Sequence, residues 1–321
     1  MTDLILHHYP SSPFSEKVRL ILGFKGLAWK SVTVPAVMPK PDVVALTGGY
    51  RKTPFLQIGA DIYCDSALIC DVLEHLQPTP TLYPESHKGL ARVLAQWADE
   101  KLFWAAMAYN FSPKGTAQMF SGGQPNMPIE QWGPVAKLFA EDRAKMRLGS
   151  PRLPLGEATA AYKSYLRRLA NMLDGQDYLL GAAPCVADFA AYHPLWFTRS
   201  CVPVMVGILN ATPAVLAWMD RMAAIGHGSS DRLSAMDAIA VCQGTTLATA
   251  ELDAAFQDEH GIALGSPVAI TSESFGPEAT EGILVAATRT RFTLERNDPR
   301  AGRVHVHFPR IGYVLQAQAQ A

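Results

Sequence analysis

The first 80 residues alternate between short apolar runs and segments whose apolar positions have helical spacing. The apolar run 4–9 ends in the Pro-Ser-Ser-Pro turn of residues 10–13 and predicts a strand. Apolar positions then recur along one helix face, at Phe14, Val18, Ile21 and Leu22. Residues 28–34 predict a second strand. The opening unit is therefore β-α-β, with two parallel strands expected.

Residues 35–80 complete a recognisable order of elements. A short helix is expected at 42–46, and a hairpin at 55–64 turns at Gly59. A last helix begins at Asp65-Ser66, carries apolar residues at helical spacing and stops at Pro78. The order β-α-β-α-β-β-α is that of a thioredoxin-like domain, so we expect residues 1–80 to form an α/β domain.

Residues 86–228 show helical spacing throughout and predict an all-helical domain. Its apolar faces are listed by helix: Leu90, Val93, Leu94, Trp97 and Leu102; Val135, Leu138 and Phe139; Tyr162, Tyr165, Leu166, Leu169 and Leu173. Between the first two helices, residues 111–134 are rich in Gly and Pro and predict a loop longer than most connections in compact domains. A loop of that length is either disordered or functional.

In the last 90 residues the pattern of apolar positions changes from helical spacing to short strands. Helical patterns at 231–243 and 245–259 precede four expected strands, at 268–271, 282–288, 291–296 and 303–308. The Gly- and Ser-rich stretch 226–230 marks a boundary. Residues 230–321 are therefore expected to form a helix and a small β-rich appendage, for which a barrel is one architecture, with no function that the pattern reveals.

Composition excludes several classes of protein. Of 321 residues 49% are hydrophobic and 18% charged, which are globular values, and 28 basic against 29 acidic side chains favour neither nucleic acid nor an anionic membrane as partner. No apolar run approaches the ~20 residues of a membrane span, and no leader is evident, so we expect a cytoplasmic protein. The five cysteines form no CxxC pair, and His305 and His307 lack further ligands nearby, so no metal is expected.

Three motifs in the first domain resemble those of glutathione transferases. They are SPFSEKVR at 12–19, RKTPFL at 51–56 and DSALI at 65–69. The resemblance extends over about residues 3–225. It implies a thioredoxin-like domain followed by a helical one, and a homodimer. It also implies glutathione as co-substrate, whose activated thiol attacks or isomerises a small hydrophobic electrophile in detoxification. The alternative function is a non-catalytic scaffold that uses the appendage to bind a partner.

Ser12 is the residue that the resemblance assigns to activation of the glutathione thiol. It precedes Pro13 at a predicted helix start, where a hydroxyl and the positive end of the helix dipole both favour a thiolate. Its simpler role is that of a helix cap. Ser11 and Tyr9 are the alternatives, because other classes carry a catalytic tyrosine at the end of the first strand. With serine in place of cysteine, dithiol redox chemistry is excluded at this position.

The same resemblance assigns the remaining glutathione contacts. Thr53, before a family cis proline at Pro54, would pair with the tripeptide main chain. Ser66 would bind the γ-glutamyl carboxylate and Asp65, in place of the usual Glu or Gln, its amine. Lys52, and less securely Lys40, would bind the glycyl carboxylate. Each of these residues also has an ordinary structural role, as an edge-strand proline, a helix cap or a solvated lysine.

Two further groups of residues complete the expectations. Trp104, Met107 and Tyr109 border the long loop and are candidates for an apolar acceptor site, although aromatic residues at helical spacing also suit a core. Cys185 and Asp188 occupy the capping positions of the family's buried helix, so this motif supports the fold rather than catalysis. Since all proposed contacts lie between Ser12 and Ser66, the appendage is expected to be dispensable for glutathione binding.

Overall fold

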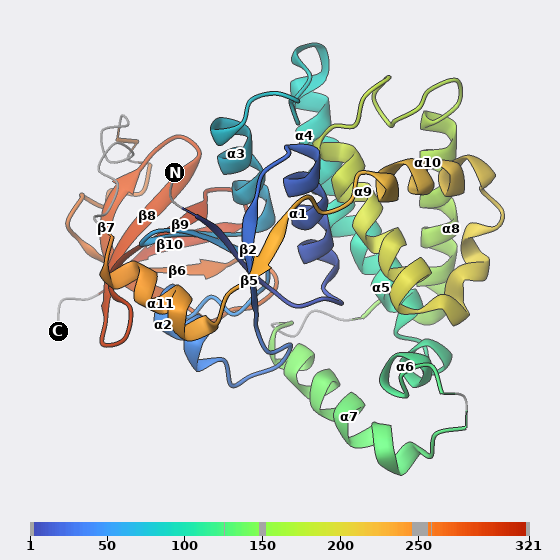
Figure 1. Cartoon of the computed structure of the whole chain (residues 1–321), viewed down its shortest axis with the longest axis horizontal. Coiled ribbons are helices and arrows are strands. Elements are labelled where there is room, and N and C mark those ends of the chain that lie inside the picture. Colours follow the sequence, from blue (N-terminus) through green and yellow to red (C-terminus); the bar gives the residue numbers. More distant parts are fainter. Residues whose placement is uncertain (1–2, 125, 148–151, 246–255, 258, 319–321) are drawn as a thin grey trace.

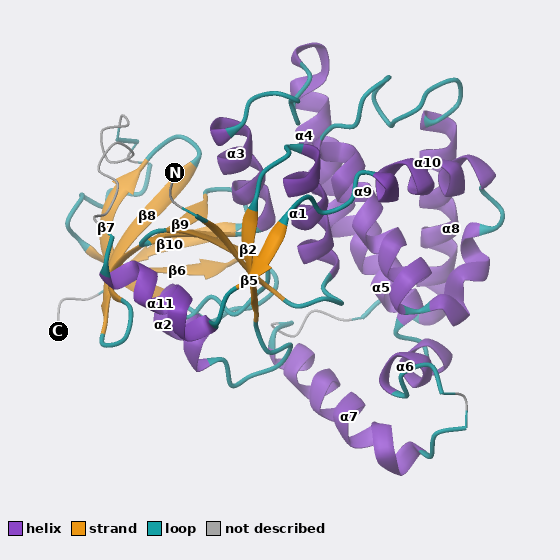
Figure 2. Cartoon of the chain, in the orientation of Figure 1, coloured by secondary structure: helices purple, strands orange, loops and turns teal. Residues whose placement is uncertain are grey.

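The computed structural model describes residues 3–124, 126–147, 152–245, 256–257 and 259–318. A large sheet lies beside a group of helices, and helix α7 (Ile129–Lys145) extends away from both (Figure 1). Colouring by secondary structure separates the two regions clearly (Figure 2). The sheet contains strands from both ends of the chain.

The N-terminal domain has the order of elements that the sequence predicts. Strand β1 pairs in parallel with β2 and antiparallel with β3, and β3 forms the hairpin with β4. The thioredoxin-like expectation is thus confirmed. Its elements are β1 (Leu4–His8), α1 (Pro13–Phe24), β2 (Trp29–Thr33), α2 (Pro41–Thr47), β3 (Phe55–Ile58), β4 (Asp61–Cys64) and α3 (Ser66–Leu76).

The second region is helical, as expected. Short 3₁₀ or π segments link its helices, at Glu85–His87, Ala98–Leu102, Phe197–Cys201 and Pro203–Leu209. The other α-helices are α4 (Lys88–Trp97), α5 (Phe103–Asn110), α6 (Pro113–Phe120), α8 (Leu155–Met172), α9 (Val186–Trp196) and α10 (Pro213–Ala224). The buried Asp188 carboxylate accepts from the backbone N–H of Leu179 and Cys185 and from the Trp218 indole, which is a structural role.

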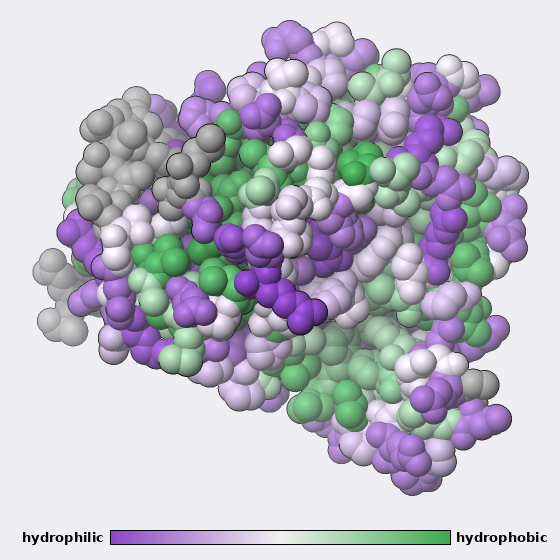
Figure 3. All heavy atoms as spheres, in the orientation of Figure 1, coloured by the Kyte–Doolittle hydropathy of each residue, from purple (hydrophilic) through white to green (hydrophobic). Residues whose placement is uncertain are grey.

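Two details of the helical prediction are wrong. The predicted loop 111–134 contains helix α6, which begins where Ser112 accepts a hydrogen bond from the Gly115 N–H and Pro113 takes the first helical position. On α4 the small residues Ala91 and Ala95 face the core, whereas Leu90 and Val93 are 53% and 67% exposed. Helix α7 also exposes apolar side chains, namely Ile129, Val135 and Leu138, and Figure 3 shows a hydrophobic area over part of this helix.

The C-terminal strands extend the thioredoxin-like sheet. The sheet runs β10-β6-β7-β8-β9-β4-β3-β1-β2-β5, with β9 parallel to β4 and β5 parallel to β2. It is open, with β10 and β5 at its edges, so the barrel architecture is wrong. The elements are β5 (Ser230–Arg232), α11 (Ala235–Gln243), β6 (Pro267–Ser272), β7 (Thr280–Ala287), β8 (Arg291–Asp298), β9 (Gly302–Pro309) and β10 (Tyr313–Ala317). Most of the helix expected at 245–259 lies outside the described residues.

The C-terminal appendage, residues 230–321, is called the tail from here on. Its described residues and the N-terminal domain bury a common apolar core. Phe55 and Ile62 of the β3–β4 hairpin belong to one cluster with Val306 and Phe308 of β9, and α11 adds Ile239. All five side chains are at most 5% exposed. Because the tail covers apolar surface of β3 and β4, this packing argues against a dispensable tail.

A buried polar contact joins β4 to β9 within that sheet. His307 Nε2 donates to Asp61 Oδ1 at 2.9 Å, and the other ring nitrogen lies 2.9 Å from the hydroxyl of Thr293 on β8. His305 Nδ1 is 3.6 Å from the same carboxylate oxygen. Burial disfavours the charge, but the two histidines outweigh it and lower the pKa of Asp61 to about 2. Asp61 is thus held ionised at the junction.

We predict that Asp61→Asn lowers the free energy of unfolding at neutral pH by roughly 2 kcal/mol. A carboxyl whose folded-state pKa lies below its ordinary 3.8 contributes stability above about pH 4, which is lost as the pH falls towards 2. The difference from wild type should therefore shrink in acid. Urea unfolding between pH 2.5 and 7 measures it, with Glu281→Gln, an exposed acid on β7, as control. Equal stability of the two variants at pH 7 would contradict the prediction.

A second prediction concerns the shared core. Phe308→Ala should lower the free energy of unfolding by about 3 kcal/mol, because it removes a 1%-exposed aromatic ring that packs in the cluster with Phe55. The control is Ile311→Ala, at a side chain that is 73% exposed, with an expected change within about 0.5 kcal/mol. Chemical denaturation measures both, and a similarly small effect of Phe308→Ala would refute a common core.

Candidate functional site

Three strand ends meet at one end of the N-terminal sheet. His7 of β1 is opposite Phe55 of β3, which is opposite Cys64 of β4. The chain leaves β1 towards Ser12, enters β3 from Pro54 and leaves β4 at Asp65. The sheet register therefore places the three sequence motifs at the same end of the domain.

Ser12 caps helix α1. Its Oγ accepts the Ser15 N–H at 3.3 Å, its side chain is 2% exposed, and Pro13 follows at the first helical position. Of the two alternatives, Ser11 is exposed, and the half-buried Tyr9 receives a hydrogen bond on its hydroxyl from Arg143 at 3.4 Å. Ser12 thus lies at the positive end of a twelve-residue helix.

The other two motifs begin strand β3 and helix α3. The Thr53-Pro54 peptide is cis, with Pro54 buried and Thr53 half-buried. Asp65 has a φ of 81° and caps α3 by accepting the Ala67 N–H at 2.9 Å. The Ser66 hydroxyl, 6% exposed, accepts from Lys17 Nζ at 3.3 Å.

A buried charged network supports Ser66, and the sequence analysis did not single it out. Lys17 is 0% exposed and forms an ion pair of 2.6 Å with Asp99, which also accepts from His193 at 2.9 Å. Burial opposes the charge of Lys17, but the Asp99 carboxylate outweighs it and raises the lysine pKa. Lys17 lies inside the first motif, yet its partner is 82 residues away, so spacing alone does not reveal the pair.

Both candidate lysines already have partners, and Lys40 is buried whereas Lys52 is half-buried. Lys40 donates to the Arg51 carbonyl at 3.0 Å, and burial, with the nearby Arg143 and Arg51, lowers its pKa to about 8. Lys52 donates to Ser272 Oγ at 3.1 Å, and burial lowers its pKa. Its ammonium also lies 4.7 Å from the ring centroid of Tyr313, on β10.

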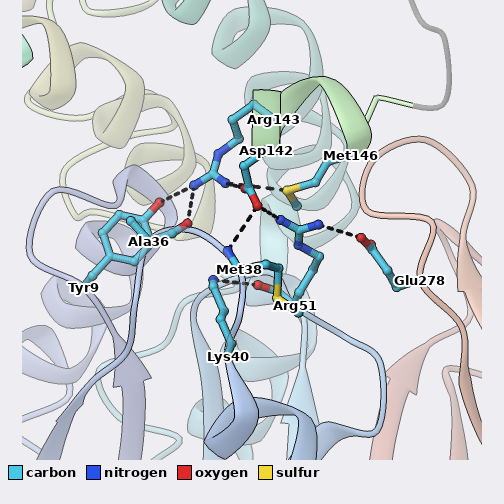
Figure 4. A network of polar contacts seen from close by, with 9 residues as sticks. All are labelled: Tyr9, Ala36, Met38, Lys40, Arg51, Asp142, Arg143, Met146 and Glu278. Carbon is cyan, nitrogen blue, oxygen red and sulfur yellow. Dashed lines mark hydrogen bonds and ion pairs between the residues drawn. The ribbon is translucent and has the colours of Figure 1, made fainter. Parts of the chain in front are cut away.

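Arg51 is the centre of a cluster of charges that the sequence analysis did not predict (Figure 4). Its guanidinium forms ion pairs with Asp142 of α7 and, at 2.7 Å, with Glu278. Asp142 also pairs with Arg143 at 2.5 Å. With Lys40, the cluster has three cations and two carboxylates, so it has an excess positive charge next to the expected tripeptide site.

The three acceptor-site candidates lie in different environments. Trp104 is half-buried, with its ring 5.1 Å from that of Phe275, in the β6–β7 connection. Met107 is 6% exposed in the helical core, and Tyr109 packs there against Tyr162 at 5.7 Å. Trp104 therefore faces the tail, whereas the other two pack among helices.

Among the described residues no group of three or more His, Cys, Asp or Glu side chains is arranged to hold a metal. His305 and His307 instead belong to the Asp61 contact. No helix within the described ranges is long and apolar enough to cross a membrane. A surface cavity of about 480 Å³ lies between Lys40 and Arg300, but neither Ser12 nor Ser66 lines it.

Family models match both regions of the chain. The model "Glutathione S-transferase, N-terminal domain" matches residues 6–81, and the model "Glutathione S-transferase, C-terminal domain" matches residues 139–221. The chain is 25% identical over 195 residues to FtsZ-localized protein A of Caulobacter vibrioides, covering 58% of this chain and 73% of that protein.

Solved structures add a relative that includes the tail. A GST-like protein from Pseudomonas syringae is 40% identical to this chain, with a TM-score of 0.82. The match covers 99% of this chain and 100% of that one. The beta-etherase LigF from Sphingobium sp. strain SYK-6 is 24% identical with a TM-score of 0.50, over 70% of this chain and 96% of that one, and so supports the fold alone. On the family models and the full-length relative, the chain belongs to the glutathione transferase superfamily.

Proposed function

We propose that the protein binds glutathione at the sheet end formed by Ser12, Pro54 and Ser66, and activates its thiol for attack on a small hydrophobic electrophile. The observation that supports this most is the position of Ser12. Its oxygen accepts the Ser15 N–H, which leaves the hydroxyl hydrogen to be donated to a thiolate. The N-terminus of α1 adds its positive end to the same stabilisation. Detoxification in the cytoplasm is the role that we propose for this chemistry.

The other contacts follow from charge and backbone geometry. The main chain of Thr53 would pair with the cysteinyl part of glutathione. Ser66, which accepts a hydrogen bond from Lys17, and the N-terminus of α3 suit the γ-glutamyl carboxylate. Asp65 suits the γ-glutamyl amine. Lys52 and the cluster around Arg51 suit the glycyl carboxylate. Lys40 would contribute positive charge to that cluster, and Trp104 an apolar wall of the acceptor site.

We predict that Ser12→Ala raises the pKa of the bound glutathione thiol by about 1 unit and lowers turnover, while affinity for glutathione changes little. Loss of the cap should also lower the free energy of unfolding by about 1 kcal/mol. Thiolate absorbance against pH and turnover with a panel of electrophiles measure the effect. Ser86→Ala, at an exposed residue, is the control, and a loss of turnover in Tyr9→Phe or Ser11→Ala but not in Ser12→Ala would transfer the role to that residue.

A second candidate function is that of a non-catalytic scaffold. The observation that favours it is that tail residues contact two expected glutathione-binding residues, Lys52 and Asp65. The likeness to FtsZ-localized protein A also supports this alternative. Calorimetric titration with glutathione separates the two functions, because a scaffold of this kind has no need of the tripeptide.

We also propose a homodimer that pairs the thioredoxin-like domain of one subunit with the helices of the other. The exposed Leu90 and Val93 on α4 provide apolar surface for such an interface. Val93→Glu should then weaken association at least tenfold, whereas Ile129→Glu on α7 should not. Light scattering against concentration measures this, and a wild-type monomer at micromolar concentration would refute the dimer.

A further inference from the structure

We propose that residues 272–280, the β6–β7 connection with the flanking residues Ser272 of β6 and Thr280 of β7, occupy the glutathione site together with Tyr313 and compete with glutathione for it. The inference rests on the proposed function, because it assigns an intramolecular occupant to the same site. Three independent groups of contacts support it, one at each end of the expected tripeptide and one across the acceptor side.

The first group lies where the glycyl carboxylate is expected. The Glu278 carboxylate accepts from Arg51 Nη1 at 2.7 Å, and the Ser272 hydroxyl accepts from Lys52 Nζ at 3.1 Å. The two ends of the connection thus place a carboxylate and a hydroxyl on adjacent cations. An oxyanion of glutathione would use the same donors.

The second group lies where the γ-glutamyl amine is expected. The Tyr313 hydroxyl donates to Asp65 Oδ2 at 2.9 Å. The other carboxylate oxygen of Asp65 is used by the Ala67 N–H. Both oxygens of Asp65 therefore have a partner before any amine arrives, and an incoming amine competes with the tyrosine for Oδ2.

The third group connects the segment to the helices. Phe275 packs against Trp104 at 5.1 Å, and the Gly276 N–H donates to the Met146 carbonyl at 2.8 Å. Gly276 has a φ of 76°, and a side chain there would lie 3.3 Å from Lys52. The segment consequently passes from the thioredoxin-like domain to α5 and the end of α7, across the acceptor side.

The contacts are suited to exchange. Glu278 has 35% of its side chain exposed and one buried oxygen without a hydrogen-bond partner. Asp142, which pairs with the same guanidinium, has only 7% of its side chain exposed. Arg51 Nε also lacks a partner. If the glycyl carboxylate of glutathione takes the place of the Glu278 carboxylate on Arg51, the charge paired with Arg51 stays the same. The Glu278 carboxylate moves into water, so the exchange requires no net burial of charge.

The experiment combines calorimetric binding of glutathione with hydrogen exchange of the full-length protein. In Glu278→Gln and in Phe275→Ala we expect affinity for glutathione to rise by about tenfold, since each removes a contact that holds the segment. Glu273→Gln, an exposed acid of the same segment, gives the same change of charge without the contact and should bind as wild type does. Added glutathione should also speed exchange of the Gly276 amide.

The outcomes separate this inference from the proposed function. If glutathione binds but exchange at residues 272–280 stays the same or slows, or if both variants bind more weakly, the segment is a wall of the site and not its occupant. The proposed function then stands and the inference fails. If glutathione binds neither wild type nor any variant at millimolar concentration, both fail.

Discussion

The edge that strand β4 would leave unpaired in the N-terminal domain alone is the constraint on which the rest of the structure depends. An exposed edge offers free N–H and C=O groups to any other strand, and proteins cover or pair such edges. Here β9 pairs with β4 in parallel over Asp61–Tyr63, and the Asp61–His307 contact adds a buried side-chain link to the backbone ladder. The tail is thereby part of the same sheet as the thioredoxin-like domain.

This pairing also determines where the rest of the tail lies. With β9 beside β4, strands β8, β7, β6 and β10 follow outward in the sheet. The segment from the end of β6 to β7 then contacts Arg51 and Lys52, which directly precede Thr53-Pro54. Tyr313, at the start of the edge strand β10, contacts Asp65 from the same direction. The strand order therefore places the tail close to the proposed glutathione site. The scaffold alternative and the proposed competition with glutathione both depend on this position.

The N-terminal fold could be predicted because its signals are local. Two adjacent residues, Ser12 and Pro13, predict the start of a helix. The strands near Pro54 are predicted by short apolar runs bounded by turn residues. The same Ser-Pro signal stands at Ser112-Pro113, where the abundance of Gly and Pro around it led to the wrong prediction of a loop.

The contacts of the tail could not be predicted because they join distant residues. Lys52 and Ser272 are 220 residues apart, and Asp65 and Tyr313 are 248 apart. Each member looks like an ordinary polar residue in its own segment. The sequence analysis also does not predict the short strands β5 and β10. For β5 the reason is that the three exposed polar residues Ser230–Arg232 have no strand pattern of their own. Each of the two strands forms because it pairs with a neighbouring strand, β5 with β2 and β10 with β6.

The parallel β4–β9 pair has a consequence for the order of events during synthesis. The ribosome delivers the N-terminal end first, so Asp61–Cys64 emerges about 240 residues before its partner strand Gly302–Pro309. The helices have their own contacts and can form in that interval, whereas the edge of β4 stays unpaired until Gly302–Pro309 has been made. Pairing so distant in sequence is slow to form. During that interval the nascent chain therefore carries an unpaired strand edge, and a chaperone that shields apolar strands would bind there.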